Sequence, residues 1–282
     1  MTILVTNDDG IHSPGLHALA VAMQALGEVW VVAPDRERNA VGHGLTLHKP
    51  LRIHQLEKRI FAINGTPSDC VNLGVKKLLR HPPALVVAGI NKGVNLGDDV
   101  TYSGTVSAAL EGTILGIPSL AVSQEGGATF RFLVGAAYAL RLARLVLREG
   151  LPEETLLNIN VPDRPLGAIA GVRFTCLSRR RFDNPIIEKV DPRGKPYYWI
   201  AGTRMSWNRR EGSDHQAIER GMVSVTPLHL DLTHYGLLEQ LHKWEPTLRA
   251  GKRGDVPRLI RATPPGRRRS RSKRPVKPKR RT

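Results

Sequence analysis

The sequence has 282 residues, a length that fits one large α/β domain or two smaller ones. Hydrophobic residues make up 41% of it, which is enough to bury a core. Its two cysteines, Cys70 and Cys176, are too few for a disulfide framework or a four-cysteine zinc site. No stretch approaches the ~20 apolar residues of a membrane span, and no signal peptide opens the chain. We therefore expect a soluble, cytoplasmic enzyme or binding protein.

The formal net charge of +17 is unevenly distributed along the chain. Residues 251–282 carry 14 Lys and Arg against one acid, Asp255, so this segment alone has a charge of +13. Like charges repel one another, and the segment has almost nothing to bury. We expect residues 1–250 to form the folded body and residues 251–282 a disordered basic tail.

Strands and helices alternate along the first 125 residues. Short apolar runs that end at polar clusters predict buried strands at residues 2–6, 29–33, 85–88 and 119–123. Helical spacing of apolar residues, with capping residues at the starts, predicts helices at 14–26, 67–79 and 103–115. Alternating residues within 45–63 predict a β-hairpin. This order predicts an α/β fold with a Rossmann-like parallel sheet flanked by helices, the hairpin being an excursion from it.

The second half of the chain has a weaker pattern. We expect a long apolar helix at 129–149, strands at 156–161 and 222–227, and an amphipathic helix at 235–249. Residues 177–215 are rich in Arg, Asn, Gly and Pro and are assigned only as a loop or hairpin region.

The polar clusters NDDG, PDRERN and GINKGVN each follow an apolar strand directly. Because ligands bind at the carboxyl ends of parallel strands, we expect the three clusters to meet at one edge of the sheet. In the first cluster, the adjacent carboxylates of Asp8 and Asp9 repel each other, which raises their pKa values unless a cation lies between them. A divalent metal such as Mg²⁺ or Mn²⁺ removes this conflict. The alternative is a pair of acids that stabilises a helix start.

Two further features strengthen the metal hypothesis. Asn39 and Asn91 supply neutral amide oxygens in the second and third clusters. The tract 102–107 opens a helix, and its backbone N–H groups with the hydroxyls of Ser103 and Thr105 are typical of a phosphate cradle. Simple helix capping explains this tract equally well when it is taken alone.

Several longer segments then appear in fixed order: VTNDDGIHSPG, VVAPDRERNAVGHGLT, NGTPSDCV, AGINKGVNLGDDVTYSGTVSAALEG and, near residue 221, GMVSVTPLHLDLT. Together they resemble the SurE family of metal-dependent nucleotide phosphatases over about residues 1–235, most weakly between 177 and 215. The resemblance implies one divalent cation per subunit, Mn²⁺ or Mg²⁺, held by Asp8, Asp9, Asn39 and Asn91. Many members carry Ser at the third of these positions. The phosphate pocket that the resemblance implies is lined by Asn95, Ser103, Gly104 and Thr105.

Members of the family hydrolyse nucleoside 5′- and 3′-monophosphates, and some act on short polyphosphate. They are dimers or tetramers in which a C-terminal extension reaches a neighbouring subunit. The resemblance therefore implies a 5′-nucleotidase that forms a homodimer or homotetramer. Asp8 and Asp9 are its candidate catalytic acids, which orient the attacking water or accept its proton; direct attack by an Asp on phosphorus is the rival route.

A different class of function uses the same fold. In that alternative the protein is a nucleotide- or nucleic-acid-binding regulator, and the basic tail binds RNA or polyphosphate without sequence preference. His12 and His43 border the expected pocket, but each is also explained as an ordinary loop histidine. Asp214 and His215, near the C-terminal motif, receive no catalytic role. Metal-dependent phosphate release from nucleotides distinguishes the two classes.

Overall fold

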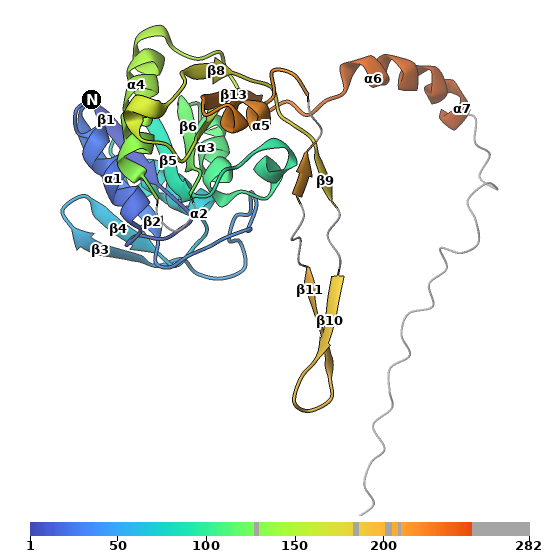
Figure 1. Ribbon diagram of the computed structural model, residues 1–282, viewed down its shortest axis with the longest axis horizontal. Coiled ribbons are helices and arrows are strands. Elements are labelled where there is room, and N and C mark those ends of the chain that lie inside the picture. Colours follow the sequence, from blue (N-terminus) through green and yellow to red (C-terminus); the bar gives the residue numbers. More distant parts are fainter. Residues whose placement is uncertain (127–129, 183–185, 201–204, 208–209, 250–282) are drawn as a thin grey trace, which may run out of the picture. The chain divides into compact units, whose positions relative to one another are not determined.

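The computed structural model describes residues 1–126, 130–182, 186–200, 205–207 and 210–249. Within that part, strands pair into one large mixed sheet and two small ones (Figure 1). The large sheet consists of β1 (Thr2–Thr6), β2 (Glu28–Pro34), β3 (Ile53–Glu57), β4 (Ile60–Ile63), β5 (Leu85–Lys92), β6 (Ser119–Gln124), β7 (Thr155–Val161), β8 (Val172–Phe174) and β13 (Val223–His229).

The order across this sheet is β3-β4-β2-β1-β5-β6-β7-β13-β8. The strands from β4 to β7 in this order are parallel, whereas β3 and β13 run antiparallel to their neighbours β4 and β7. The carboxyl ends of β1, β2 and β5 therefore lie at one edge, as the sequence predicts.

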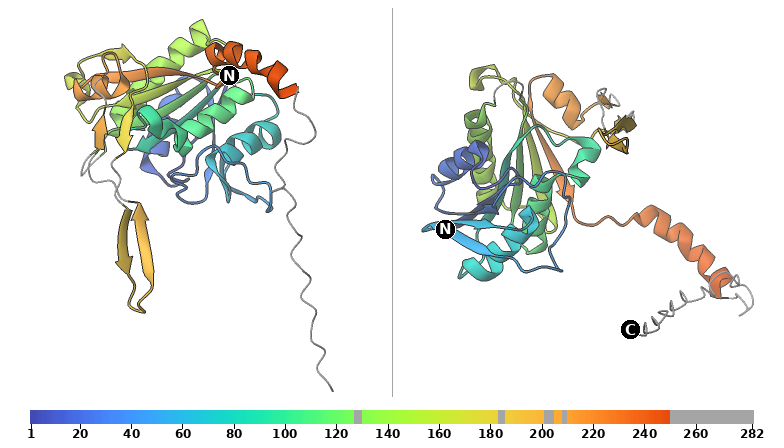
Figure 2. Two further views of the ribbon diagram at one scale, coloured as in Figure 1. Left: turned by 90° about the vertical axis from the view of Figure 1, so that its right-hand side faces the viewer. Right: turned by 90° about the horizontal axis from the view of Figure 1, so that it is seen from below.

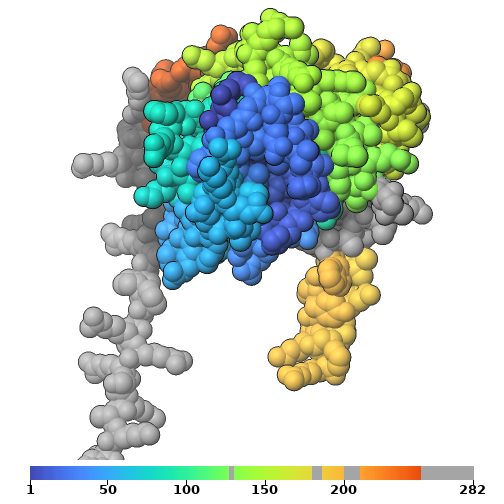
Figure 3. Space-filling view, turned by 90° about the vertical axis from the view of Figure 1, so that its left-hand side faces the viewer, coloured from blue at the N-terminus to red at the C-terminus, as the bar shows by residue number. Residues whose placement is uncertain are grey.

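Helices cover both faces of the sheet (Figure 2). One face carries α1 (Pro14–Met23) and α4 (Phe132–Glu149), which pack against each other. The blue and light-green surfaces of these parts of the chain lie side by side in Figure 3. The other face carries α2 (Pro67–Leu73) and α3 (Gly104–Ile114). The predicted fold class, a mostly parallel sheet between helices with a β3–β4 hairpin, is confirmed.

Successive side chains of β1 point alternately into the two layers of the core, one on each face of the sheet. Ile3 and Val5 pack toward α1 and α4, and Leu4 packs toward α2 and α3, because successive side chains of a strand point to opposite faces. All three side chains are fully buried. Burial of each is worth about 1.5–3 kcal/mol, so β1 is anchored from both sides and its carboxyl end is held in place.

Small residues let α3 lie close against the sheet. A Cβ atom at Gly112 would lie 2.4 Å from the Ser119 Oγ and 3.0 Å from the Val86 Cβ, so no side chain fits between helix and sheet there. At the other end of α3, the Ser103 Oγ accepts a hydrogen bond of 3.1 Å from the Val106 N–H and caps the helix. The N-terminus of α3 is therefore fixed beside the carboxyl end of β1.

Some predicted elements differ from the observed ones. The helix expected at 67–79 ends as α2 at Leu73 and continues as a π-helical turn, η1 (Gly74–Leu78). The hairpin expected at 45–63 is confined to β3 and β4; the preceding residues are held by side chains, the Thr46 N–H donating to Asp69 at 2.9 Å. Residues 127–129, at the start of the helix expected at 129–149, lie outside the described residues.

Within residues 177–215, expected as a loop or hairpin region, the described residues contain two antiparallel strand pairs. β9 (Arg180–Phe182) pairs with β12 (Met205–Trp207), and β10 (Ile186–Val190) pairs with β11 (Pro196–Ile200), both antiparallel. We call residues 179–212 the arm. After it the chain forms α5 (Asp214–Glu219) and then β13.

The chain divides into two compact units, Met1–Asp231 and Leu232–Thr282. In the second unit, the helix expected at 235–249 is divided into α6 (Tyr235–Leu241), the 3₁₀ turn η4 (His242–Trp244) and α7 (Glu245–Arg249). The tail expected to be disordered, residues 251–282, lies outside the described residues. Across the described parts of both units, no helix is long and apolar enough to cross a membrane.

Candidate active site

The two carboxylates after β1 meet the N-terminus of α3. Asp8 is buried, with 4% of its surface exposed, and the Thr105 hydroxyl donates a hydrogen bond to its Oδ1. A Cβ atom at position 104 would lie 2.7 Å from the Asp8 Cβ, so only glycine allows the helix to approach this closely. The fold thus brings together two segments almost 100 residues apart.

Both acids are harder to ionise than ordinary aspartates. Burial raises the pKa of Asp8 to about 6; the hydrogen bond from Thr105 opposes this, and the charge of Asp9 adds to it. Burial also raises the pKa of Asp9, against the opposing charge and backbone N–H of Lys92, while the charge of Glu37 adds to the increase. At neutral pH the ionised pair is under electrostatic strain that a bound cation would relieve.

Asn91 lies at an irregularity in the sheet. The register between β5 and β6 shifts between Ala88 and Asn91, a kind of bulge that redirects side chains near functional sites. The Asn91 Nδ2 donates to the Gly93 carbonyl at 2.9 Å, which leaves the amide oxygen as the group able to bind a cation. The next residue, Lys92, donates its N–H to the Asp9 Oδ2 at 3.3 Å, so this strand end lies beside Asp9.

Asn39 is placed at the same edge by a backbone hydrogen bond of the preceding residue, Arg38. The Arg38 N–H donates to the Asp8 carbonyl oxygen at 2.8 Å, which places this segment next to the paired acids. The Asn39 side chain is exposed, and its amide nitrogen donates to the Glu37 carboxylate. Glu37 was not among the predicted site residues, although it is the second acid in the PDRERN cluster and acts on the pKa of Asp9.

The expected phosphate-binding residues have distinct partners in the structure. Because the Ser103 Oγ accepts from the Val106 N–H, its own hydrogen is left to donate to a ligand. The Thr105 hydroxyl instead gives its hydrogen to Asp8. Gly104 lies between them and has its backbone against Asp8.

Asn95 is clamped by two residues that sequence analysis missed. Its N–H donates to the Asn160 Oδ1 at 2.7 Å, and its carbonyl accepts from the Asn158 Nδ2 at 2.9 Å. Its side-chain nitrogen donates to the Ser123 Oγ at 2.7 Å. Asn158 and Asn160 are fully buried in β7. The available signal was two asparagines in the otherwise apolar strand TLLNINV, since buried amides need partners.

The donor set of this edge fits a hard divalent cation. Among the described residues, no group of three His, Cys, Asp or Glu side chains is placed to hold a metal. The site instead offers the two carboxylates of Asp8 and Asp9. Asn91 directly precedes Lys92, whose N–H reaches Asp9, and the Asn39 side chain is hydrogen-bonded to Glu37. Oxygen ligands of this kind suit Mg²⁺ or Mn²⁺, and the raised pKa values show that a positive charge would be favoured there.

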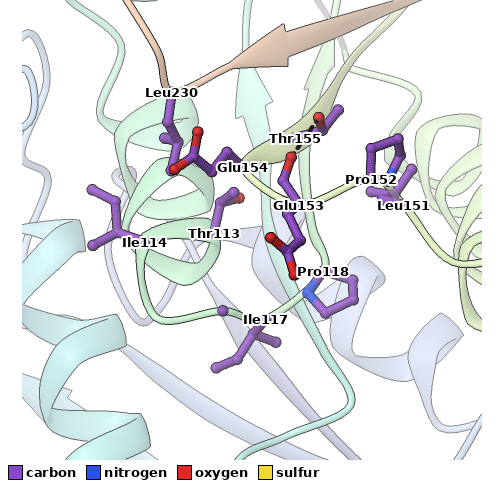
Figure 4. A pocket seen from close by; sticks show the side chains of 11 residues that line it. Thr113, Ile114, Ile117, Pro118, Leu151, Pro152, Glu153, Glu154, Thr155 and Leu230 are labelled. Carbon is purple, nitrogen blue, oxygen red and sulfur yellow. Dashed lines mark hydrogen bonds between the residues drawn. The ribbon is translucent and has the colours of Figure 1, made fainter.

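Two cavities of about 500 Å³ lie away from these acids. The first is at the amino ends of β6 and β7, the edge opposite the paired acids, and Glu153, Pro118 and Leu230 are among its lining residues (Figure 4). The second lies between α1 and the start of α4 and includes Phe130 and Phe132. The candidate site is therefore identified by its chemistry and not by cavity size.

Comparison with known proteins agrees with this geometry. The model of the family Survival protein SurE matches residues 3–184, which contain all eight of the predicted site residues. The chain belongs to the SurE family.

Relatives within the SurE family are similar over nearly their whole length. The 5′-nucleotidase SurE of Geotalea uraniireducens (strain Rf4) is 54% identical over 251 residues, which cover 88% of this chain and 100% of the relative. The 5′-nucleotidase SurE of Geobacter sulfurreducens is 55% identical over 246 residues, covering 87% and 94%. The crystal structure of the SurE protein from Aquifex aeolicus superposes with a TM-score of 0.80 at 45% identity, covering 87% of this chain and 100% of that one.

Proposed function

We propose that this protein hydrolyses nucleoside 5′-monophosphates to nucleoside and phosphate with one divalent cation, Mg²⁺ or Mn²⁺. The observation that carries the proposal is the buried Asp8–Asp9 pair placed against the N-terminus of α3. The pair binds the cation together with Asn91 and Asn39. The name 5′-nucleotidase SurE of relatives more than 50% identical supports the nucleotide as substrate.

Each part of the site has a role in this reaction. A bound cation supplies Lewis acidity and lowers the pKa of water. The N–H groups at the start of α3 and the Ser103 hydroxyl donate to the phosphate oxygens, where negative charge increases during the reaction. Thr105 keeps the Asp8 carboxylate in one orientation. Asp9 is the less buried acid, and its side chain orients the attacking water or accepts its proton.

Recognition through the phosphoryl group also accommodates nucleoside 3′-monophosphates and the ends of short polyphosphate.

Attack by Asp8 or Asp9 itself is the competing mechanism. Hydrolysis in ¹⁸O-water with a phosphoenzyme trap separates the two routes. In a single turnover, label in the Asp carboxylate or a trapped acyl phosphate shows attack by Asp and overturns direct attack by water. Label in the phosphate alone is produced by both routes, so direct attack by water is supported when the carboxylate is unlabelled and no phosphoenzyme is trapped.

The test of the function is phosphate release from a panel of nucleoside monophosphates with Mn²⁺, with Mg²⁺ and with EDTA. We expect Asp8→Asn and Asp9→Asn each to lower kcat/KM at least about 100-fold, which corresponds to about 2.7 kcal/mol of transition-state stabilisation. Asp191→Asn, a change of the same chemistry at a half-buried residue beside the turn of the arm, is the matched control and keeps full activity. Near-normal turnover of either Asp8 or Asp9 variant contradicts the metal assignment.

A second candidate function, polyanion binding, is favoured by the charge of +13 on residues 251–282. Such a segment attracts RNA or polyphosphate by counterion release.

Assembly into a homodimer or homotetramer is supported by exposed apolar side chains in the second unit, among them Leu232 at 92%, Leu248 at 77% and Trp244 at 63% exposure. Analytical ultracentrifugation tests the assembly; a monomer at micromolar concentration overturns it.

A further inference from the structure

Asp214 is a fully buried acid outside the site described above, and three segments of the chain converge on it. Its Oδ2 accepts the Gly97 N–H at 2.8 Å. Its Oδ1 accepts the Ser178 N–H at 2.8 Å and the His215 N–H at 2.7 Å. Its own N–H donates to the Cys176 carbonyl at 2.9 Å. One carboxylate thus joins the segment after Asn95, the first turn of α5, and Ser178, which directly precedes the arm and which we call its base.

The contact with Gly97 is tight in a way that admits no side chain. Gly97 has φ +52°, and a Cβ atom there would lie 2.5 Å from the Ser178 carbonyl oxygen. The turn of residues 95–97 is therefore pressed against Ser178 and held there by Asp214. At its other end, Asn95 is held by Asn158 and Asn160 of β7.

This turn leads directly to the phosphate-binding helix. Gly97 begins the 3₁₀ turn η2 (Gly97–Thr101), the Ser103 N–H donates to the Asp99 carbonyl at 3.2 Å, and Ser103 caps α3. A displacement at Gly97 is therefore passed to Asn95 on one side and to the Ser103 end of α3 on the other. Asp8 and Asp9 follow β1, and Asn91 lies in β5. None of the hydrogen bonds of Asp214 reaches these strands, and the link from α3 to the paired acids is the hydrogen bond from Thr105 to Asp8.

We propose that Asp214 is a positioning residue for substrate phosphate: it fixes the 95–97 turn, and with it Asn95 and the start of α3, against the base of the arm. The proposal rests on the function proposed above, because it assumes that the phosphate binds at Asn95 and the α3 N-terminus. It assigns Asp214 no contact with substrate. Phosphate binding depends on Asp214 through Asn95 and Ser103, whereas the cation site is linked to Asp214 only indirectly, through Thr105 and Asp8.

The test compares Asp214→Asn with Ser213→Ala in the full chain. An amide has one acceptor oxygen where the carboxylate has two, so Asp214→Asn cannot accept from both Gly97 and the Ser178–His215 pair. Ser213 is the neighbouring N-cap, whose Oγ accepts from the Gln216 N–H. Its loss destabilises the same helix without touching Gly97. Both variants are therefore expected to lower Tm.

For Asp214→Asn we expect KM for a nucleoside monophosphate and Ki for inorganic phosphate to rise by roughly tenfold, the size of one lost hydrogen bond to a charged group. We expect kcat to fall as well, because the N–H groups of α3 and the Ser103 hydroxyl also stabilise charge in the transition state. The Mn²⁺ concentration for half-maximal activity should stay within about twofold, which is less than the energy of one neutral hydrogen bond. Ser213→Ala is expected to keep KM, Ki and kcat. Equal KM for both variants, or a parallel shift in the Mn²⁺ requirement of Asp214→Asn, overturns the proposal.

Amide hydrogen exchange gives a measurement that does not depend on catalysis. In Asp214→Asn we expect faster exchange across residues 95–101, with unchanged protection in β1 and β5; Ser213→Ala should change only α5. Unchanged exchange at 95–101 overturns the positioning role. The two proposals are distinguished if the wild-type protein releases no phosphate from any nucleotide while Asp214→Asn still speeds exchange across residues 95–101. In that case the proposed function is wrong, but the structural role of Asp214 in holding this segment stands.

Discussion

At the scale of single residues, the burial of Asp8 gives the metal-free protein a specific pH dependence. The pKa of Asp8 is about 6 in the folded protein and 3.8 ordinarily. Between these values the folded state holds a proton that the unfolded state has lost, so the free energy of unfolding decreases as pH rises through this window. The full effect is about 3 kcal/mol at 1.36 kcal/mol per pKa unit, and it is complete above pH 6.

We therefore expect Asp8→Asn to be more stable than the wild type at pH 7.5 in EDTA, and the difference to disappear near pH 4. The amide still accepts from Thr105 but carries no charge. Denaturant unfolding across pH 4–8 measures this. Asp35→Asn is the control with the opposite sign, because Arg36 lowers the pKa of Asp35 and its ionised form is favoured in the folded state. A wild type that is at least as stable as Asp8→Asn at pH 7.5 without metal contradicts the raised pKa.

Asn39 supplies the second prediction at this scale. Asn39→Ser keeps an oxygen ligand and is expected to retain the wild-type Mn²⁺ requirement. Asn39→Ala removes the oxygen, and we expect the Mn²⁺ concentration for half-maximal activity to rise by about 10–100-fold, the range seen when metal sites lose a supporting group. A titration of activity with Mn²⁺ measures both. If Asn39→Ser and Asn39→Ala behave alike, the Asn39 side chain is not a ligand and its hydrogen bond to Glu37 is its structural role.

At the scale of elements, the loop of residues 36–50 has no regular structure and depends on side chains for its position. Glu111 of α3 is buried, and its carboxylate accepts from His43 at 2.9 Å and from the Asn72 Nδ2 of α2 at 2.6 Å. The hydrogen bond with His43 is the main cause of the lowered pKa of Glu111. This acid thus ties the loop that contains Asn39 to both helices on one face of the sheet.

We expect Glu111→Gln to lower the free energy of unfolding by about 2 kcal/mol, since it weakens two buried hydrogen bonds to a charged group. The Mn²⁺ requirement should rise severalfold because the loop that contains Asn39 loses an anchor. As the pKa of Glu111 is lowered, its contribution to stability is present above its ordinary value of 4.5 and is lost as pH falls below that value. Wild type and variant should therefore converge in strongly acidic solution.

Thermal unfolding against pH and a Mn²⁺ titration check these outcomes together. Glu149→Gln, at an exposed position at the end of α4, is the matched control and should leave both quantities unchanged. An unchanged Mn²⁺ requirement in Glu111→Gln would show that the loop is held without this carboxylate.

At the scale of the whole molecule, charge and catalytic chemistry occupy different parts of the chain. All predicted site residues precede residue 110, whereas most of the net charge lies after residue 250. We expect a truncation that ends at Ala250 to keep kcat for a nucleoside monophosphate but to lose most affinity for RNA. On duplex nucleic acid, the lost contacts reduce the log–log salt slope by about 0.9 for each phosphate no longer neutralised.

Titration of both chains with labelled RNA at several salt concentrations, with kcat measured in parallel, tests this separation. A full-length chain in which the lysines and arginines of residues 251–282 are replaced by serine serves as the length-matched control. Equal RNA affinity and equal salt slope for the full and truncated chains would place the polyanion site in the body.

Local patterns in the sequence were sufficient for the architecture and for placing the paired acids at the end of β1. Apolar runs specify β1, β2, β5 and β6, because a strand buried on both faces needs apolar side chains throughout. The polar clusters after these strands meet at one edge, since parallel strands all end on the same side. Motif order was sufficient for the family.

Only the tertiary structure decided the partners of individual side chains. Thr105 donates to Asp8, and Glu111 binds His43 across 68 residues. Asp214 accepts from Gly97 across 117 residues. No local pattern encodes such pairs, because each depends on where two distant segments are placed by the packing of the sheet and helices. A buried polar group must find a partner, but which partner it finds is determined by the fold as a whole.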